Sequence, residues 1–159
     1  MGKRLAGFLC SNSTRKLDVK IFWDTNLFIY LWEKKAFIPE MAALTDFIES
    51  GRHTLATSTL TLGEILVHPV RSGAGSVASQ YLEAMQQLLL IPFEQDAAIR
   101  FANLRAENPA LRPPDAIQLA CAMTERCQLF ITNDNRLTSV TGMTNLKVQS
   151  LTDWMNNPS

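Results

Sequence analysis

Residues 21–28 constrain the fold of this 159-residue chain more than any other stretch. An apolar run ends at Asp24, passes through a hydroxyl and an amide side chain, and then turns apolar again. A buried strand that stops at a carboxylate and continues as a helix places this carboxylate at the carboxyl edge of a sheet, where open α/β sheets bind ligands. The segment therefore predicts a buried strand followed by an acid at a functional edge.

The rest of the chain alternates between short apolar runs and helical periodicity. We expect helices from residue 26 to 32, from 39 to 51, and over 59–67, 76–88, 94–107 and 114–126. We expect strands at residues 17–23, 53–57, 88–93, 127–132 and 146–149. Pro69 should close one helix, residues 71–76 should form a flexible loop, and residues 152–156 should fray. This order predicts an α/β protein with a mostly parallel sheet that helices cover on both faces.

Length and composition favour one folded domain over residues 17–155. Residues 1–16 resemble a signal peptide superficially, but the apolar stretch is short and interrupted, so an unstructured leader or extension is the better interpretation. No run of about 18 apolar residues is present to span a membrane. Three cysteines without metal-ligand spacing favour reduced thiols and a cytoplasmic protein.

The charge balance excludes a general attraction to polyanions. Fifteen basic and fifteen acidic residues leave a formal net charge of zero. Any nucleic-acid binding must therefore depend on local patches or on metal ions.

Four acids stand where elements begin or end, and each has an ordinary structural explanation. Asp24 could cap a helix, and Glu64 could complete a capping box that starts at Thr61. Asp115 could be a first-turn acid that suits the helix dipole, and Asp134 could be a turn residue.

The joint placement of these acids points to a metal site. All four can reach one edge of the predicted sheet, where crowded carboxylates would repel one another unless they take up protons or share a cation. Mg²⁺ and Mn²⁺ prefer carboxylate oxygens and bridge phosphates, so the cluster suggests metal-assisted phosphoryl chemistry. Thr25, Asn26 and Thr132 could support the acids, or could be ordinary turn residues.

The motifs resemble those of PIN-domain ribonucleases, most closely the VapC-type toxins of toxin–antitoxin modules. Four segments carry the resemblance in chain order: Asp24-Thr25-Asn26, Glu64 in a short helix, residues 114–120 with the sequence Pro-Asp-Ala-Ile-Gln-Leu-Ala, and residues 131–134 with the sequence Ile-Thr-Asn-Asp. It implies a three-layer α/β/α fold and an RNA substrate. It also implies an acidic Mg²⁺ or Mn²⁺ pocket of Asp24, Glu64, Asp115 and Asp134, with Thr132 as the supporting hydroxyl. From it we further expect a small antitoxin partner and a homodimer.

The chain departs from the family pattern at one position near the last motif. Many relatives carry a further acid two residues after the position of Asp134, and Arg136 stands there instead. A second metal could therefore bind weakly or only with substrate. Arg136 and Arg112 are candidate contacts to the RNA, the alternative for Arg136 being an exposed arginine with no role.

With this resemblance, the acids predict a metal-dependent endoribonuclease that acts as a toxin, in which an activated water attacks phosphorus and leaves 5′-phosphate ends. The alternative is an inert PIN-like module that binds a protein or RNA without cleaving it. A small-molecule phosphatase is a weaker candidate, because Asp24-Thr25-Asn26 lacks the second aspartate of an Asp-x-Asp motif.

Overall fold

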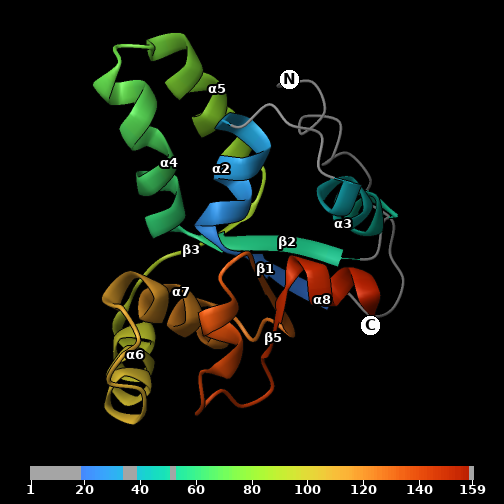
Figure 1. Cartoon of the computed structure of the whole chain (residues 1–159). Helices are drawn as coiled ribbons and strands as arrows, with labels where there is room; N and C mark the ends of the chain where they lie inside the picture. Colours follow the sequence, from blue (N-terminus) through green and yellow to red (C-terminus); the bar gives the residue numbers. More distant parts are fainter. Residues whose placement is uncertain (1–18, 34–38, 51–52, 158–159) are drawn as a thin grey trace.

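The computed structural model describes residues 19–33, 39–50 and 53–157, and these residues form helices packed on both faces of a five-stranded sheet (Figure 1). The strands are β1 (Val19–Trp23), β2 (His53–Ser58), β3 (Leu89–Ile91), β4 (Leu129–Thr132) and β5 (Lys147–Ser150). Their order across the sheet is β3-β2-β1-β4-β5, and every neighbouring pair is parallel. The predicted three-layer architecture with a parallel sheet is confirmed. The expected leader at residues 1–16 and the first two residues of the first strand lie outside the described residues.

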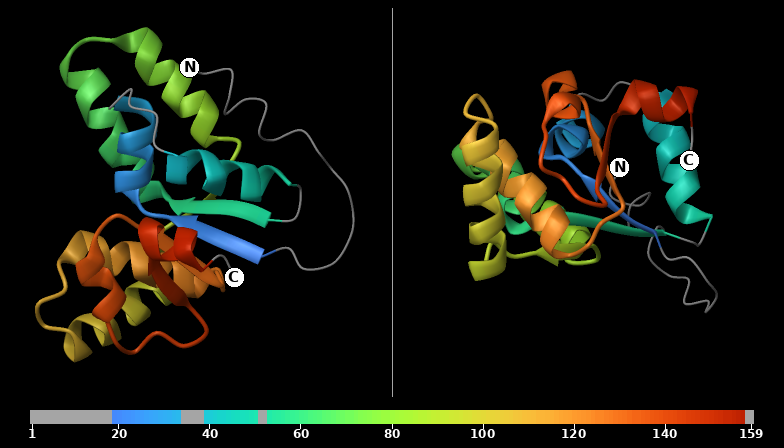
Figure 2. Two further views of the ribbon diagram at one scale, coloured as in Figure 1. Left: turned by 45° about the vertical axis from the view of Figure 1, so that its right-hand side comes forward. Right: turned by 90° about the horizontal axis from the view of Figure 1, so that it is seen from below.

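The helices divide between the two faces of the sheet (Figures 1 and 2). One face carries α2 (Thr25–Glu33), α3 (Pro39–Glu49), α4 (Thr59–Arg71), α5 (Gly75–Met85) and the terminal α8 (Leu151–Asn156). The other carries α6 (Gln95–Glu107) and α7 (Pro113–Thr124). A short 3₁₀ helix, η2 (Asn135–Ser139), follows β4.

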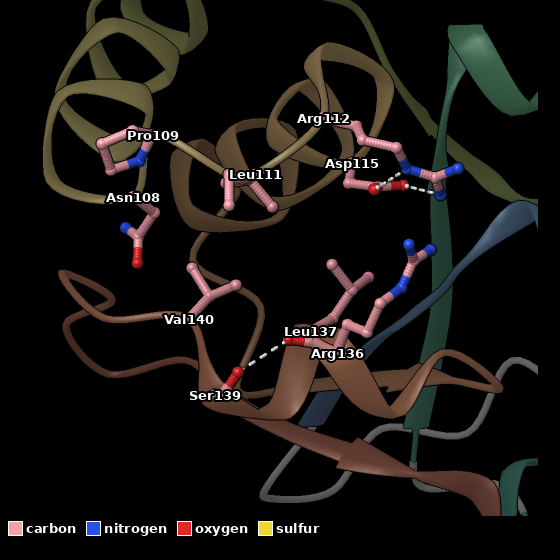
Figure 3. Close-up of a pocket in the computed structure, with 10 residues that line it drawn as sticks. Asn108, Pro109, Leu111, Arg112, Asp115, Arg136, Leu137, Ser139 and Val140 are labelled. Carbon is pink, nitrogen blue, oxygen red and sulfur yellow. Dashed lines mark hydrogen bonds and ion pairs between the residues drawn. The ribbon is translucent and has the colours of Figure 1, made fainter.

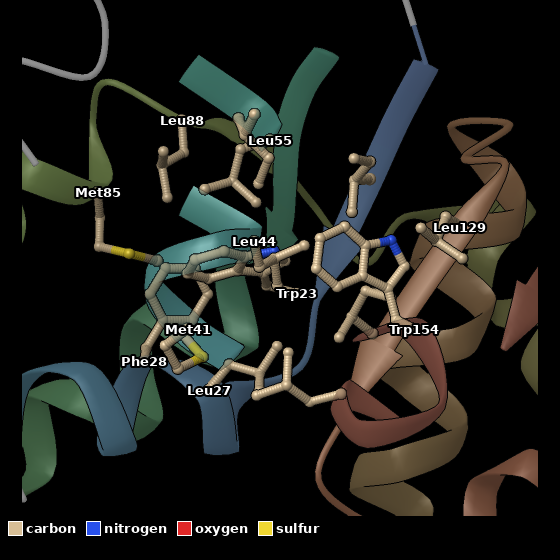
Figure 4. Close-up of a cluster of buried hydrophobic side chains, with 14 of the residues drawn as sticks. Trp23, Leu27, Phe28, Met41, Leu44, Leu55, Met85, Leu88, Leu129 and Trp154 are labelled. Carbon is tan, nitrogen blue, oxygen red and sulfur yellow. The ribbon is translucent and has the colours of Figure 1, made fainter. Parts of the chain in front are cut away.

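Strand residues supply the two hydrophobic cores alternately, as the pleat of a strand requires. Ile21 and Trp23 of β1 point into the larger core, which α2, α3, α4 and α8 complete (Figure 4). Phe22 points to the opposite face, where its ring stacks on that of Phe130 with centroids 4.9 Å apart. Burial on both faces explains why the second half of β1, residues 21–23, is apolar throughout rather than alternating.

Two sequence-based expectations about helix ends are wrong. Helix α4 continues through Pro69 to Arg71 and leaves only residues 72–74 before α5. Pro69 is buried, and near a helix end its missing N–H costs one hydrogen bond while its ring adds packing. Residues 152–156 do not fray but belong to α8, because Ser150 caps this helix and Trp154 is buried against Phe47, with ring centroids 5.3 Å apart.

Candidate active site at the carboxyl edge of the sheet

The four predicted acids lie at one edge of the sheet. The strand order reverses between β1 and β4, and this is the position where parallel sheets bind ligands. Asp24 directly follows β1, and Asp134 lies two residues beyond the end of β4. Glu64 projects from the second turn of α4, and Asp115 lies in the first turn of α7, both helices beginning at this edge. The backbone positions of all four acids therefore lie at this edge, and their joint role as a site stays a prediction.

Asp24 is the most enclosed of these acids, with only 7% of its surface exposed. One carboxylate oxygen accepts the backbone N–H of Thr25 at 2.8 Å, and the other accepts the Thr132 hydroxyl at 2.6 Å and the Asn26 amide at 2.9 Å. Burial nevertheless raises the pKa of Asp24 from 3.8 to about 6, with smaller upward contributions from the charges of Asp115 and Glu64. The carboxylate therefore sits in a negative field that a cation would relieve.

Thr132 and Asn26 connect the ends of β1 and β4. The Thr132 hydroxyl donates to Asp24 and accepts the backbone N–H of Asp134 at 2.9 Å. The Asn26 side-chain oxygen accepts the backbone N–H of Asn133 at 3.1 Å. The residues expected to support the acids thus lie directly against them, and their effect on a bound ligand stays a prediction.

Glu64 is held by a hydroxyl and not by a capping box. The Thr25 hydroxyl donates to the Glu64 carboxylate at 2.5 Å. Ser58 is the N-cap of α4 and accepts the backbone N–H of Thr61 at 3.2 Å, so Thr61 lies inside the helix. The capping-box explanation of Glu64 is therefore wrong, and its side chain is directed at the acidic edge through Thr25.

Sequence reasoning missed Gln118, which organises the layer beneath the acids. This side chain is 2% exposed, and its amide donates to the hydroxyls of Thr25 at 2.9 Å and Thr61 at 2.8 Å. Its oxygen accepts the Ser58 hydroxyl at 2.6 Å. The available signal was its position three residues after Asp115, which places both on the same side of α7.

Two arginines bind the remaining acids. Arg112 donates to Asp115 from Nε at 2.8 Å and from Nη2 at 3.2 Å, and its Nη2 lies 3.7 Å from Asp134. Arg136 donates from Nε to both oxygens of Asp134 at 2.9 and 3.1 Å, and its Nη2 pairs with the same carboxylate. The guanidinium of Arg136 lowers the pKa of Asp134. Arg136 therefore has a partner in the fold, and its proposed contact to RNA stays a prediction.

The ordinary explanations of Asp115 and Asp134 also hold. Asp115 occupies the first turn of α7, and Asp134 caps η2 by accepting the backbone N–H of Arg136 at 3.0 Å. Helix-start geometry and a ligand role are compatible, because the carboxylates stay partly exposed at the edge.

The donor set suits a hard divalent cation. Its side chains offer only carboxylate, hydroxyl and amide oxygens, as Mg²⁺ and Mn²⁺ prefer. Among the described residues, no group of three or more acidic, histidine or cysteine side chains is arranged to hold a metal ion. Because two of the acids bind arginines, a complete set of ligands requires Arg112 and Arg136 to turn away.

Comparison with known proteins agrees with this geometry. Residues 21–143 match the PIN domain family. A chain in the crystal structure of VapBC2 from Rickettsia felis bound to a promoter DNA fragment is similar, with a TM-score of 0.68 and 18% identity over 82% of this chain and 98% of that one. A toxin–antitoxin complex from Klebsiella pneumoniae contains a chain with a TM-score of 0.58 and 26% identity over 79% and 94%. No curated protein matches the sequence.

The family match covers most of the chain and includes all four acids, so this protein belongs to the PIN domain family. Members of this family are generally nucleases and usually use divalent metal ions. In the described residues, no helix is both long and apolar enough to cross a lipid bilayer.

Proposed function

We propose that this protein is a divalent-metal-dependent endoribonuclease that hydrolyses RNA phosphodiester bonds and serves as the toxin of a type II toxin–antitoxin pair. The observation that carries the proposal is the convergence of Asp24, Glu64, Asp115 and Asp134 at the edge where the strand order reverses. A shared set of hydrogen bonds and charges connects them: Thr132 contacts both Asp24 and Asp134, while Asp115 and Glu64 act on the pKa of Asp24.

The four acids would hold Mg²⁺ or Mn²⁺. An ion held there would lower the pKa of a bound water and offset charge on the phosphate oxygens. Thr132 and Asn26 fix the Asp24 carboxylate, and Thr25 orients that of Glu64, so these residues position the ligands before RNA arrives. Phosphate binding gives no base selectivity, so selection among RNA sequences falls to residues outside the acidic cluster.

A small antitoxin, a homodimeric assembly and a cytoplasmic location belong to the same proposal. The antitoxin is supported by the likeness to a toxin–antitoxin complex of Klebsiella pneumoniae at 26% identity, and by the fold that this chain shares with VapBC2 of Rickettsia felis.

The proposal is tested by incubating the purified protein with single-stranded RNA and Mn²⁺ or Mg²⁺. We expect cleavage that leaves 5′-phosphate ends, and loss of at least about a hundredfold in rate for Asp24→Asn and Asp115→Asn. Asp46→Asn is the matched control, because Asp46 is an exposed acid near the carboxyl end of α3, which leads into the amino end of β2, opposite the acidic edge. Full activity in both site variants would refute the assignment.

The second candidate is an inert PIN-like module that binds a partner without cleavage. One observation favours it: arginines already pair with Asp115 and Asp134, so the acids are neutralised without a metal ion. Thermal melting separates the two candidates. A rise in melting temperature on adding Mn²⁺, absent in Asp24→Asn, supports the nuclease, whereas no rise in the wild type supports the inert module.

A further inference from the structure

A pocket of about 370 Å³ opens directly beside Asp115 (Figure 3). One wall is the connector between α6 and α7 with the first turn of α7, and the other is η2 with the residues after it. The volume lies in the lower part of the range typical of small-molecule sites. We propose that this pocket binds one nucleotide of a single-stranded RNA next to the phosphate that is cut, an inference that rests on the proposed function.

The interior of the pocket suits a nucleobase. Much of the lining is apolar: it includes Leu111 and Pro109 on the connector wall, and Leu137 and Val140 on the wall of η2 (Figure 3). Two polar residues of the lining are already engaged within the chain: the Ser139 hydroxyl donates to the Arg136 carbonyl at 2.9 Å, and the Asn108 amide donates to the Leu104 carbonyl at 3.0 Å. The flat faces of a nucleobase can pack on these apolar walls while its polar edge stays at the open side of the pocket, whereas a peptide backbone would leave N–H and C=O groups against them without partners.

The rim of the pocket suits a phosphate. Arg112 and Arg136 enter the opening from opposite walls, and their side chains are 58% and 68% exposed. The pKa of Arg112 is raised, chiefly by its hydrogen bond to Asp115, and the charge of Arg136 acts in the opposite direction, so the two guanidinium groups lie close enough to repel. A phosphate between them would bind both arginines and remove this repulsion, and guanidinium planes also stack on bases in RNA complexes.

The walls are held in place before any ligand binds. Asn108 joins them: its amide donates to the Thr141 carbonyl at 3.0 Å, and its oxygen accepts the Thr141 backbone N–H at 3.1 Å. Arg105 donates to the Pro109 carbonyl at 3.2 Å and also bonds the Leu111 carbonyl. A site that is already formed spends little binding energy on ordering its own residues.

A nucleotide seated here would change the charge pairing of the acidic edge. Arg112 and Arg136 would move from Asp115 and Asp134 to the phosphate, and the two carboxylates would become available for a metal ion. RNA and metal would then bind cooperatively, because each favours the same rearrangement of the arginines.

The test measures RNA binding without cleavage, in EDTA, by fluorescence anisotropy of a labelled ten-nucleotide single-stranded RNA. Ala110 is exposed and lines the pocket, so Ala110→Trp puts an indole into it while every acid and arginine of the site is kept. We expect Ala110→Trp to raise Kd about tenfold, the effect of losing one stacked base. Ala98→Trp is the matched control, because Ala98 is an exposed alanine on α6 outside the pocket, and it should leave Kd unchanged. Equal affinity of both variants would overturn the proposal.

A second measurement does not depend on the variant folding. Photo-crosslinking of wild-type protein to RNA that contains 4-thiouridine, followed by mass spectrometry, should place crosslinks on residues 108–112 or 137–140. Crosslinks confined to other segments would overturn the pocket assignment even if the protein cleaves RNA. Crosslinks in the pocket without any cleavage in Mn²⁺ would support the pocket and refute the nuclease, so the two proposals fail separately.

Discussion

Two opposing effects act on the pKa of Asp24. Hydrogen bonds to its carboxylate lower the pKa, and desolvation raises it by more. Three donors contact its carboxylate, yet burial raises its pKa to about 6. In the metal-free protein the folded state therefore holds a proton on Asp24 at a pH where the unfolded chain has released it.

We expect this difference to appear as pH-dependent stability. Between the unfolded value of 3.8 and about 6, the folded state binds more protons, so the free energy of unfolding should fall as pH rises through this window. A rise from 3.8 to about 6 corresponds to about 3 kcal/mol in total, of which about 2 kcal/mol is lost between pH 4.5 and about 6. Urea unfolding in EDTA from pH 4.5 to 8 measures the decline, which should vanish in Asp24→Asn and persist in Asp46→Asn. A decline of equal size in Asp24→Asn would contradict the assignment.

The pH range of this unfolding experiment is chosen to avoid the effect of Asp134 on stability, which has the opposite sign to that of Asp24. Its pKa is lowered, chiefly by its hydrogen bond from Arg136, so its stabilising contribution is present above the unfolded pKa and is lost as pH falls. Starting at pH 4.5 keeps this loss outside the measured window.

Arg136 should have opposite effects on the two ligands. It competes for the oxygens of Asp134 in the free protein and reaches the rim of the pocket. We expect Arg136→Ala to tighten Mn²⁺ binding about two- to fivefold, the range typical of one exposed ion pair, and to weaken RNA binding in EDTA. Isothermal titration with Mn²⁺ and anisotropy with RNA measure the two effects.

Arg100→Ala is the control for this comparison, because Arg100 is an exposed arginine on α6. If Arg136→Ala weakened Mn²⁺ binding, the competition between this arginine and the metal would be refuted.

At the scale of elements, one side chain ties three helices together. Gln118 of α7 bonds Thr25 at the start of α2 and two residues at the start of α4, Ser58 and Thr61. The Thr57 hydroxyl extends this network by bonding Thr61 at 2.9 Å and the Trp23 carbonyl at 2.9 Å. The helices that carry Glu64 and Asp115 are therefore fixed relative to each other by buried hydrogen bonds.

Replacing Gln118 should loosen this arrangement. In Gln118→Leu the side chain keeps a similar size, but buried hydroxyls lose their partners, at a cost of about 1–3 kcal/mol for each group left unsatisfied. Urea unfolding measures the loss of stability. Gln87→Leu is a control, because Gln87 is exposed between α5 and β3. No loss beyond that of the control would show that the network adds nothing to stability.

The elements also show what the sequence could predict. Apolar runs that end in an acid located Asp24 and Asp134 at strand ends, because parallel strands share one carboxyl edge. Gln118 could not be found this way, because only the packed fold brings Ser58, Thr25 and Thr61 around it. The arginine pairs depend on the path of the connector before α7 and of η2, which periodicity does not describe.

The wrong helix ends have a similar origin. Helix α8 has six residues, too few for a periodic pattern, and its stability comes from the Ser150 cap and the buried Trp154. A proline ends a helix only where the lost hydrogen bond costs more than the packing of its ring contributes. Pro69 is buried, so α4 continues through it.

At the scale of the whole molecule, α4 leaves apolar surface uncovered. Val67 and Val70, three residues apart on this helix, are 50% and 68% exposed. The α4–α5 pair extends away from the sheet (Figure 2). Apolar side chains gathered on a projecting element are typical of a protein interface, and they support the proposed homodimer.

We expect Val70→Asp to shift the protein from dimer to monomer, because association would bury an unpaired carboxylate. Light scattering after size-exclusion chromatography measures the mass. Ile99→Asp, at a 54% exposed position on α6, should leave the dimer intact. A wild-type mass equal to one chain would refute the homodimer, and a dimer that survives Val70→Asp would exclude this face.

The acids at the carboxyl edge come from residues 24 to 134 of a 159-residue chain. A ribosome must therefore synthesise most of the polypeptide before Asp134, which follows β4, can join Asp24, which follows β1. In the proposed ribonuclease, a chain truncated before Asp134 lacks the complete set of carboxylates, so we expect it not to cleave RNA. We therefore expect the proposed cleavage to start only after the segment around Asp134 has been made and folded against β1.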